Sequence, residues 1–188
     1  MAMEIELRID EVEPGMRWNR LQSLAGVPAV AHFLSYRDDA KLVWFREPGA
    51  AVPDDPLVQR TTVHHLTPAF GSTIGNVEDL GRIDANVLEI RRYRIAPGQR
   101  DRFARFFHDR TLDAQRRCGI AIYGQFNDRD DENLLVWLRG FPNLLERERR
   151  KADFYQSRYW VDELQDEAYA MIEDYTNVLL VMPVTACA

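Results

Sequence analysis

A carboxylate, a guanidinium and a phenol occur at every second position near the middle of the chain. These residues are Glu89, Arg91 and Tyr93, and they share one face because side chains alternate along a strand. Together they could supply a base, a clamp for an anion and a proton donor. They could also be buried ion pairs that fix how sheets pack, since a buried charge requires a partner.

Near the start of the chain, Glu6 and Arg8 repeat this spacing, and both copies precede a Pro-Gly pair, at residues 14–15 and 97–98. Asp10 stands where the second copy has its tyrosine. A site that is needed once has no reason to appear twice, so the repetition favours a structural role for the charged pairs. The pattern predicts a tandem chain of two related units, the first of which is shortened and diverged.

Three histidines mark positions where the two copies differ. His32 stands where the second copy has Gln125, and His64 and His65 stand where it has leucines. Histidine is easily poised near neutral pH, so an acid–base site could have been added at these positions. Alternatively, one histidine ends a strand in solvent and another is hydrogen-bonded in the core. The adjacent pair points to opposite faces, so only one of the two can reach a given cavity.

These observations define two sets of candidate residues. The catalytic candidates are His32, His64, His65, Tyr93, Glu89 and Arg91. The substrate-binding candidates are Glu6, Arg8, Asp10, Trp44, Tyr123, Gln125 and Trp137. The aromatic members could stack on a planar ligand, although aromatic residues at strand spacing more often belong to the core. No metal-site spacing, nucleotide-binding loop or serine-hydrolase motif is present, so the sequence predicts no metal and no other cofactor. Haem bound through one of the first-copy histidines is an alternative that no other feature of the sequence supports.

Alternating apolar and polar residues, separated by glycine and proline, predict the elements of both units. In the first unit we expect strands at 5–10, 27–35, 41–46 and 61–67, a helix at 16–24 and at most one or two helical turns around residue 57. In the second unit we expect strands beginning at residue 87 and at 120–127, 134–139 and 177–183, with helices at 99–118, 142–152 and 162–174. The order β-α-β-β-α-β is that of a ferredoxin-like unit. The predicted domains are therefore residues 1–70 and residues 87–188, joined by a linker at 71–86.

The third strand of each unit is apolar on both faces, at residues 42–45 and 134–138. An isolated ferredoxin-like sheet would leave one face in water and alternate polar and apolar residues there. We therefore predict an α+β fold of two ferredoxin-like (βαββαβ) units packed sheet to sheet as an intrachain dimeric α/β barrel. Helices are expected on the faces that carry Leu7 and Leu88, and the charged sets are expected between the sheets.

Composition limits the partners and the cellular compartment. The 188 residues are 46% hydrophobic and 29% charged, with a net charge of -6 that offers no attraction to nucleic acid or an anionic membrane. Neither a signal peptide nor a membrane span is evident. Only two cysteines occur, Cys118 and Cys187, and we expect both to be free thiols. These features predict a cytoplasmic protein whose partner is a small-molecule ligand or substrate, with a homodimer as a further candidate assembly.

The second unit resembles the NIPSNAP family over its whole length. The matching positions are Glu89, Arg91 and Tyr93, residues 97–98, 124–126 and 136–139, Arg147, Trp160 and residues 179–183. The resemblance implies the ferredoxin-like fold and the dimeric α/β-barrel superfamily. That superfamily includes cofactor-independent monooxygenases, isomerases, cyclases and dehydratases, as well as haem enzymes, so the resemblance implies no single reaction.

Two functional hypotheses follow. The first is a NIPSNAP-like enzyme that uses cofactor-independent acid–base chemistry (isomerase, cyclase, dehydratase or monooxygenase type) on a small apolar or aromatic metabolite, as in bacterial secondary metabolism. The second is a non-catalytic small-ligand-binding or protein-interaction module of the same fold. Loss of turnover on replacing the histidines or Tyr93 would favour the first hypothesis. Ligand binding without turnover would favour the second.

Overall fold

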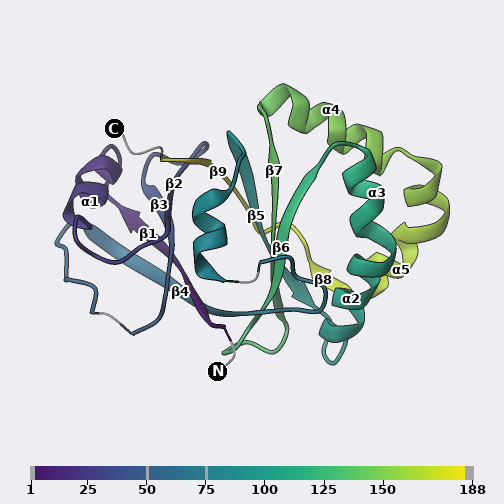
Figure 1. The fold of residues 1–188 in the computed structure, drawn as a ribbon, viewed down its shortest axis with the longest axis horizontal. Helices are drawn as coiled ribbons and strands as arrows, with labels where there is room; N and C mark the ends of the chain where they lie inside the picture. The colour runs from purple at the N-terminus through teal and green to yellow at the C-terminus, as the bar shows by residue number, and fades with distance from the viewer. Residues whose placement is uncertain (1–2, 50, 75, 185–188) are drawn as a thin grey trace.

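Eight antiparallel strands close into a barrel in the computed structural model, which describes residues 3–49, 51–74 and 76–184 (Figure 1). The strands are β1 (Ile5–Val12), β2 (Ala31–Ser35), β3 (Lys41–Arg46), β4 (Val58–Pro68), β5 (Val87–Ile95), β6 (Ala121–Asp128), β7 (Leu134–Phe141) and β9 (Val178–Pro183). Around the barrel their order is β7–β6–β4–β1–β3–β2–β9–β5, and β5 pairs with β7 to close the ring. A short strand, β8 (Ile172–Asp174), lies beside the end of β5.

The barrel consists of two groups of four strands with the same internal order. The first group is β4–β1–β3–β2 and the second group is β9–β5–β7–β6. Their edges are hydrogen-bonded to each other, with Leu66 opposite Asp128 between β4 and β6, and Phe33 opposite Pro183 between β2 and β9. The expected sheet-to-sheet packing is therefore corrected to a closed ring. Closure pairs the backbone groups that separate sheets would leave open at their edges.

Corresponding positions of the two groups have corresponding partners across the strands. The pairs are Glu6–Arg46 and Arg8–Trp44 in the first group, and Glu89–Arg139 and Arg91–Trp137 in the second group. In each group a carboxylate therefore lies opposite an arginine, and the next arginine on the same face lies opposite a tryptophan.

The interior of the barrel is apolar. Its lining includes Ile5, Leu7, Ile9, Phe33, Phe45, Leu88, Ile90, Phe126, Val136 and Leu138. This placement contradicts the expectation that Leu7 and Leu88 lie beneath helices and that the charged sets lie between the sheets. A barrel of this size has just enough interior space for its own side chains. Burying charges there without partners would be costly, so the apolar face lies inside and the charged face outside.

Most of the helices cover the outer face of the second group (Figure 1). The segments α2 (Arg100–Phe106), η2 (Phe107–Thr111) and α3 (Leu112–Arg117) form one continuous helix with a π-helical centre. They are followed by α4 (Leu144–Tyr155), η3 (Tyr159–Leu164) and α5 (Gln165–Ala170). The outer face of the first group is covered by α1 (Arg17–Ser23) alone among the described helices, where Leu24 packs with Leu42 and Trp44. This difference leaves the second group with the thicker apolar cover.

The connector between the groups contributes to the core. Its short 3-10 helix η1 (Val77–Arg82) inserts Val77 and Leu80 into the same apolar cluster as the barrel interior. The side chain of Asn76 caps this helix by accepting a hydrogen bond from the Asp79 backbone N–H. Residues 71–86 were expected to be a linker, but part of this segment is buried structure.

Most of the predicted elements are confirmed, with differences at their ends. Residues 56–57 form a turn and not a helix, and β8 lies within the helix predicted at 162–174. Cys118 is a partly exposed free thiol, whereas Cys187 lies outside the described residues. Among the described helices none is long and apolar enough to span a membrane.

Candidate functional site

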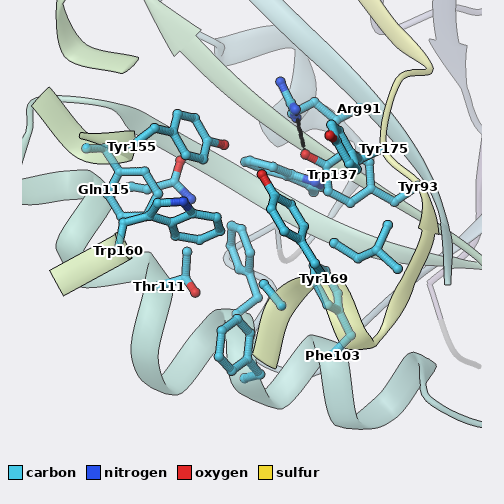
Figure 2. A pocket seen from close by; sticks show the side chains of 15 residues that line it. Arg91, Tyr93, Phe103, Thr111, Gln115, Trp137, Tyr155, Trp160, Tyr169 and Tyr175 are labelled. Carbon is cyan, nitrogen blue, oxygen red and sulfur yellow. Dashed lines mark hydrogen bonds between the residues drawn. The ribbon is translucent and has the colours of Figure 1, made fainter. Parts of the chain in front are cut away.

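An aromatic cavity of ≈ 200 Å³ lies between the outer face of the second group and its helices (Figure 2). Its apolar wall includes Phe103, Phe106, Phe107, Trp137, Phe154 and Trp160. Polar groups enter it from Arg91, Tyr93, Thr111, Gln115, Tyr155, Tyr169 and Tyr175. Small-molecule sites commonly combine apolar walls with a few convergent polar groups, and their volumes are about 300–1,000 Å³. The volume observed here lies below that range, which limits the ligand to a small molecule of one ring or two fused rings.

Local sequence periodicity explains how these side chains come together. Residues Phe103, Phe107, Thr111 and Gln115 are four apart, so the continuous helix presents them on one face toward the sheet. The alternation of β5 directs Arg91 and Tyr93 outward beneath that face. The remaining wall comes from β7, α4, η3 and the chain around β8.

The phenol of Tyr93 is fixed by its strand neighbour. Arg91 donates hydrogen bonds to the Tyr93 hydroxyl oxygen from Nε at 2.8 Å and from Nη2 at 2.5 Å, as the dashed line in Figure 2 marks. Because both contacts occupy the oxygen as an acceptor, the hydroxyl proton can be donated to a ligand in the cavity. Burial raises the pKa of Tyr93, which keeps this proton on the phenol near neutral pH.

The pKa of Tyr155 is shifted in the opposite direction to that of Tyr93. Its hydroxyl oxygen accepts a hydrogen bond from Arg139 Nη1 at 3.2 Å. Burial alone would raise the pKa of Tyr155, but the guanidiniums of Arg139 and Arg91 outweigh burial and lower the pKa. Two phenols in one cavity thus have pKa values shifted in opposite directions, as in sites that divide acid and base roles between like groups.

Below the cavity floor, Glu89 is fully buried and contacts three arginines. Its Oε2 accepts hydrogen bonds from Arg91 Nη1 and Arg139 Nε, each at 2.6 Å. Its Oε1 contacts Arg147 through Nε at 2.6 Å and Nη2 at 2.5 Å. Burial would raise the pKa of Glu89, but the charges of Arg139, Arg91 and Arg147 lower it far below its ordinary value. Glu89 is therefore an ionised anchor for the arginines and cannot act as a proton carrier near neutral pH.

Two buried polar atoms of the cavity wall have no hydrogen-bond partner among the described residues. They are Trp137 Nε1 and Thr111 Oγ1. Buried donors in proteins are almost always paired, and an unpaired one costs free energy. Both atoms belong to residues that line the cavity, so a bound ligand could supply the missing partners.

The corresponding face of the first group holds ion pairs and an open groove. Glu6 contacts Arg46 at 3.3 Å and Arg8 at 3.5 Å. Asp10 accepts hydrogen bonds from Arg20, Trp44 Nε1 and Thr61 at 2.8, 3.2 and 2.8 Å. The groove beside Arg8 and Arg20 has a volume of ≈ 580 Å³, but it is polar and open to solvent. We therefore place the candidate site in the smaller and more apolar aromatic cavity.

The three predicted histidines do not meet in this cavity. His64 Nδ1 lies 2.8 Å from Asp128 Oδ2, and its Nε2 lies 3.3 Å from Arg92 Nη1. His65 Nδ1 lies 2.5 Å from Asp130 Oδ2. The side chain of His65 is on the same face of the sheet as Glu6, its partner on β1. His32 stacks on Trp44 and burial lowers its pKa. All three belong to strands of the first group, whereas the cavity belongs to the second.

Two further predicted residues have structural contacts outside the cavity. The hydroxyl of Tyr123 donates to Asp84 O at 2.8 Å, and Gln125 Nε2 donates to Phe70 O at 2.5 Å and Ala104 O at 3.1 Å. These bonds fasten the connector and α2 to the barrel. Of the predicted site residues, Arg91, Tyr93 and Trp137 line the aromatic cavity and Glu89 lies beneath them.

Sequence reasoning did not select several residues of the site. Tyr155, Gln115, Arg139 and Arg147 were outside both candidate sets, although Tyr155 and Trp160 belong to a recognisable aromatic stretch. The spacing of four between residues 103, 107, 111 and 115 was the signal that could have identified one wall. Within the described ranges, no group of three His, Cys, Asp or Glu side chains is arranged to hold a metal ion.

Comparison with known proteins supports this description of the fold. The NIPSNAP family profile matches residues 88–186, which is more than half of the chain. A comparison with curated proteins gives no match. Among solved structures, the chain is similar to a proposed monooxygenase from Lactobacillus acidophilus NCFM, with a TM-score of 0.65 and 8% identity over 98% of this chain and 95% of that one.

Two other solved structures are also similar. A proposed chlorite dismutase aligns with a TM-score of 0.59 and 13% identity over 98% of this chain and 96% of that one. An uncharacterized NIPSNAP domain protein from Burkholderia xenovorans aligns with a TM-score of 0.49 and 16% identity, over 54% of this chain and 98% of that one. At these identities, the full-length matches show a shared barrel fold.

Proposed function

The chain belongs to the NIPSNAP family, and we propose that it is an enzyme that performs acid–base chemistry on a small aromatic molecule bound in the aromatic cavity. The observation that carries this proposal is the aromatic cavity with two arginine-bonded phenols, Tyr93 and Tyr155. The full-length structural neighbours described as a proposed monooxygenase and a proposed chlorite dismutase make a small-molecule enzyme plausible.

In the proposed mechanism, the two phenols have complementary roles. Tyr155, whose pKa is lowered, acts in its ionised form: its phenolate oxygen accepts a proton from the substrate and becomes a neutral phenol, while Arg139 and Arg91 stabilise the negative charge that is left on the substrate. Tyr93, with its raised pKa, donates its hydroxyl proton to an oxygen that gains negative charge. Aromatic walls orient the ring and exclude water. Such proton transfers serve isomerisation, cyclisation, dehydration or the activation of a substrate toward oxygenation.

A spectroscopic titration with 2-naphthol tests the proposal before a natural substrate is known. The absorption spectrum of this probe distinguishes its neutral and ionised forms. We expect binding to the wild-type protein with a lowered apparent pKa of the naphthol, because Tyr155 and the arginines favour proton loss. Tyr155→Phe should remove this shift and retain binding, and Tyr93→Phe should weaken hydrogen bonding to the naphthol oxygen.

Tyr159→Phe is the matched control, because Tyr159 donates its hydroxyl to Arg110 O at 3.2 Å and does not line the cavity. Its naphthol spectrum should equal that of the wild type. Binding with no Tyr155-dependent shift would refute the catalytic role and favour a non-catalytic ligand-binding protein. Absence of binding would refute the assignment of the cavity itself.

We also propose that the chain contains two ferredoxin-like repeats, residues 1–70 and 87–188, with residues 71–86 between them and a diverged first copy. The shared strand order of the two groups supports this proposal, as do the corresponding pairs Glu6–Arg46 and Glu89–Arg139. In this view the Glu-x-Arg pairs are structural and shared by both repeats. The low cysteine content agrees with a cytoplasmic location.

A further inference from the structure

We propose that the substrate carries an oxyanion head group, a carboxylate or a phosphate, which binds in a cationic basin beside the aromatic cavity. The inference rests on the proposed function and names the substrate class for the same site. The cationic basin is a second cavity of ≈ 270 Å³, and its charged lining residues are Arg37, Arg91, Arg139, Arg147 and Lys151.

The cationic basin and the aromatic cavity adjoin each other. Arg91, Tyr155 and Tyr175 line both of them. Figure 2 shows Arg91 and Tyr175 together at one side of the aromatic cavity. A ligand with its ring in the aromatic cavity can therefore extend a substituent past Tyr155 into the cationic basin.

Positive charge in the basin exceeds the negative charge available from the protein. No acidic side chain belongs to its described lining. The carboxylate of Glu89, beneath it, is shared by Arg91, Arg139 and Arg147.

Among the described residues, the other carboxylate paired with the lining cations is that of Glu148, which contacts Arg147 and lies 3.6 Å from Lys151. Its side chain is 62% exposed, so water screens much of its charge. The five lining cations together thus have ion pairs with two described carboxylates, and one of these is largely solvated.

One guanidinium has an unused donor. Arg139 is fully buried, and its Nη2 has no hydrogen-bond partner among the described residues. Its Nη1 contacts Gln115 and Tyr155, and its Nε contacts Glu89. A buried charged donor without a partner is costly, and an oxyanion in the basin would satisfy it.

The side chain of Arg37 enters from the other half of the molecule. Arg37 lies in the turn between β2 and β3, in the first group, and reaches the basin across the junction of β2 with β9. Both Arg37 and Lys151 lie outside the Glu89 cluster and outside the aromatic cavity. Their charges can therefore be removed without leaving Glu89 unpaired.

Arginine and lysine side chains bind carboxylate and phosphate oxygens through charge-assisted hydrogen bonds. A neutral group in the same place lacks this attraction and binds more weakly. The neighbouring aromatic cavity selects a planar apolar body. The predicted substrate class is consequently an aromatic acid or an aryl phosphate. Because Tyr155 lies at the boundary, it faces the part of the substrate next to the head group.

Isothermal titration with 2-naphthoate, 2-naphthyl phosphate and neutral 2-naphthamide tests the inference at low ionic strength. We expect at least one of the two anions to bind about tenfold more tightly than the amide. Lys151→Gln and Arg37→Gln should each lower the affinity for that anion several-fold and leave the amide affinity unchanged. The tighter of the two anions identifies whether the basin suits a carboxylate or a phosphate.

Arg82→Gln is the control for charge, because Arg82 lines neither cavity and makes a comparable pair with Asp79 at 3.5 Å. It should leave all three affinities unchanged. Equal binding of the anions and the amide, or equal losses in the control and the basin variants, would overturn the oxyanion site and leave the aromatic cavity intact. If no naphthyl probe binds, the cavity assignment and the inference both fail.

Discussion

Replacing Glu89 with glutamine should destabilise the protein more than any other single charge removal on the barrel strands. The substitution keeps the size of the side chain but removes the charge that three arginines share. Glutamine also replaces one acceptor oxygen with an NH₂ group, which faces guanidinium donors. The positive charges of Arg91, Arg139 and Arg147 would then remain, each on a side chain that is at most 9% exposed.

The expected loss in the free energy of unfolding is about 3–5 kcal/mol, the usual cost of removing one partner from a buried ion pair. The four contacts between 2.5 and 2.6 Å place Glu89→Gln in the upper part of that range. For a domain of this length, about 1 kcal/mol changes the melting temperature by about 2–4 °C, so Tm should fall by about 6–20 °C. Urea denaturation followed by circular dichroism measures the free energy directly.

The first strand group provides the matched control. Glu6 occupies the corresponding position, but its contacts with Arg46 and Arg8 are 3.3 and 3.5 Å and its side chain is 12% exposed. Glu6→Gln should therefore cost only about 1–2 kcal/mol. Adding Arg147→Gln to Glu89→Gln should restore part of the lost stability, because one uncompensated charge is removed.

A loss below about 1 kcal/mol for Glu89→Gln would refute the reasoning, since the cluster would then contribute little net stability. An equal loss for Glu6→Gln would also refute it, because it would show that burial and contact distance do not decide the cost. If the double variant were less stable than Glu89→Gln, repulsion among the arginines would not be the cause of the loss.

Two further predictions follow from the same structure. Folding lowers the pKa of Glu89, so the stability that its charge contributes is fully present above the ordinary value of 4.5 and is lost as the pH falls below 4.5. Below pH 4.5 the difference in unfolding free energy between the wild type and Glu89→Gln should therefore shrink by up to about 1.4 kcal/mol per pH unit. Urea denaturation at a series of pH values measures this difference. A constant difference down to pH 3 would contradict this. Gly140→Ala should lower the free energy of unfolding by about 1–3 kcal/mol, because the added Cβ would lie 2.6 Å from Ala85 Cβ and from Tyr123 Cε2. An unchanged Tm would contradict this, since it would show that the connector moves aside without loss of stability.

Much of the secondary structure could be predicted because its signals are local. Strict alternation located β1 and β5, and glycine after each first helix marked where that helix ends, at Gly26 and Gly119. Apolar residues on both faces of β3 and β7 correctly indicated that both sides of the sheet are covered. These features depend on neighbours in sequence, so the chain alone contains them.

The orientation of the sheet could not be predicted in the same way. Alternation on β5 separates Leu88 and Ile90 from Glu89 and Arg91, but it does not say which face meets the helices. Assigning the helices to the face of Leu88 and Ile90 placed the charged residues between the two sheets. The structure encloses them beneath helices instead, where Arg147 from α4 reaches Glu89. That partner is distant in sequence, and no local pattern connects the two residues.

The position after the shared Glu-x-Arg pair is where the two groups differ in chemistry. In the first group Asp10 is paired with Arg20 from α1 and bonded to Trp44 and Thr61, and the groove beside these contacts is polar and open to solvent. In the second group Tyr93 occupies this position and bonds to Arg91, and its face opens into the aromatic cavity. A barrel interior filled with apolar side chains has no room for a ligand, whereas a helical layer over a charged face can leave space between the two. The corresponding pairs therefore help to hold both groups together, and the exchange of an aspartate for a tyrosine accompanies the aromatic cavity on the second group.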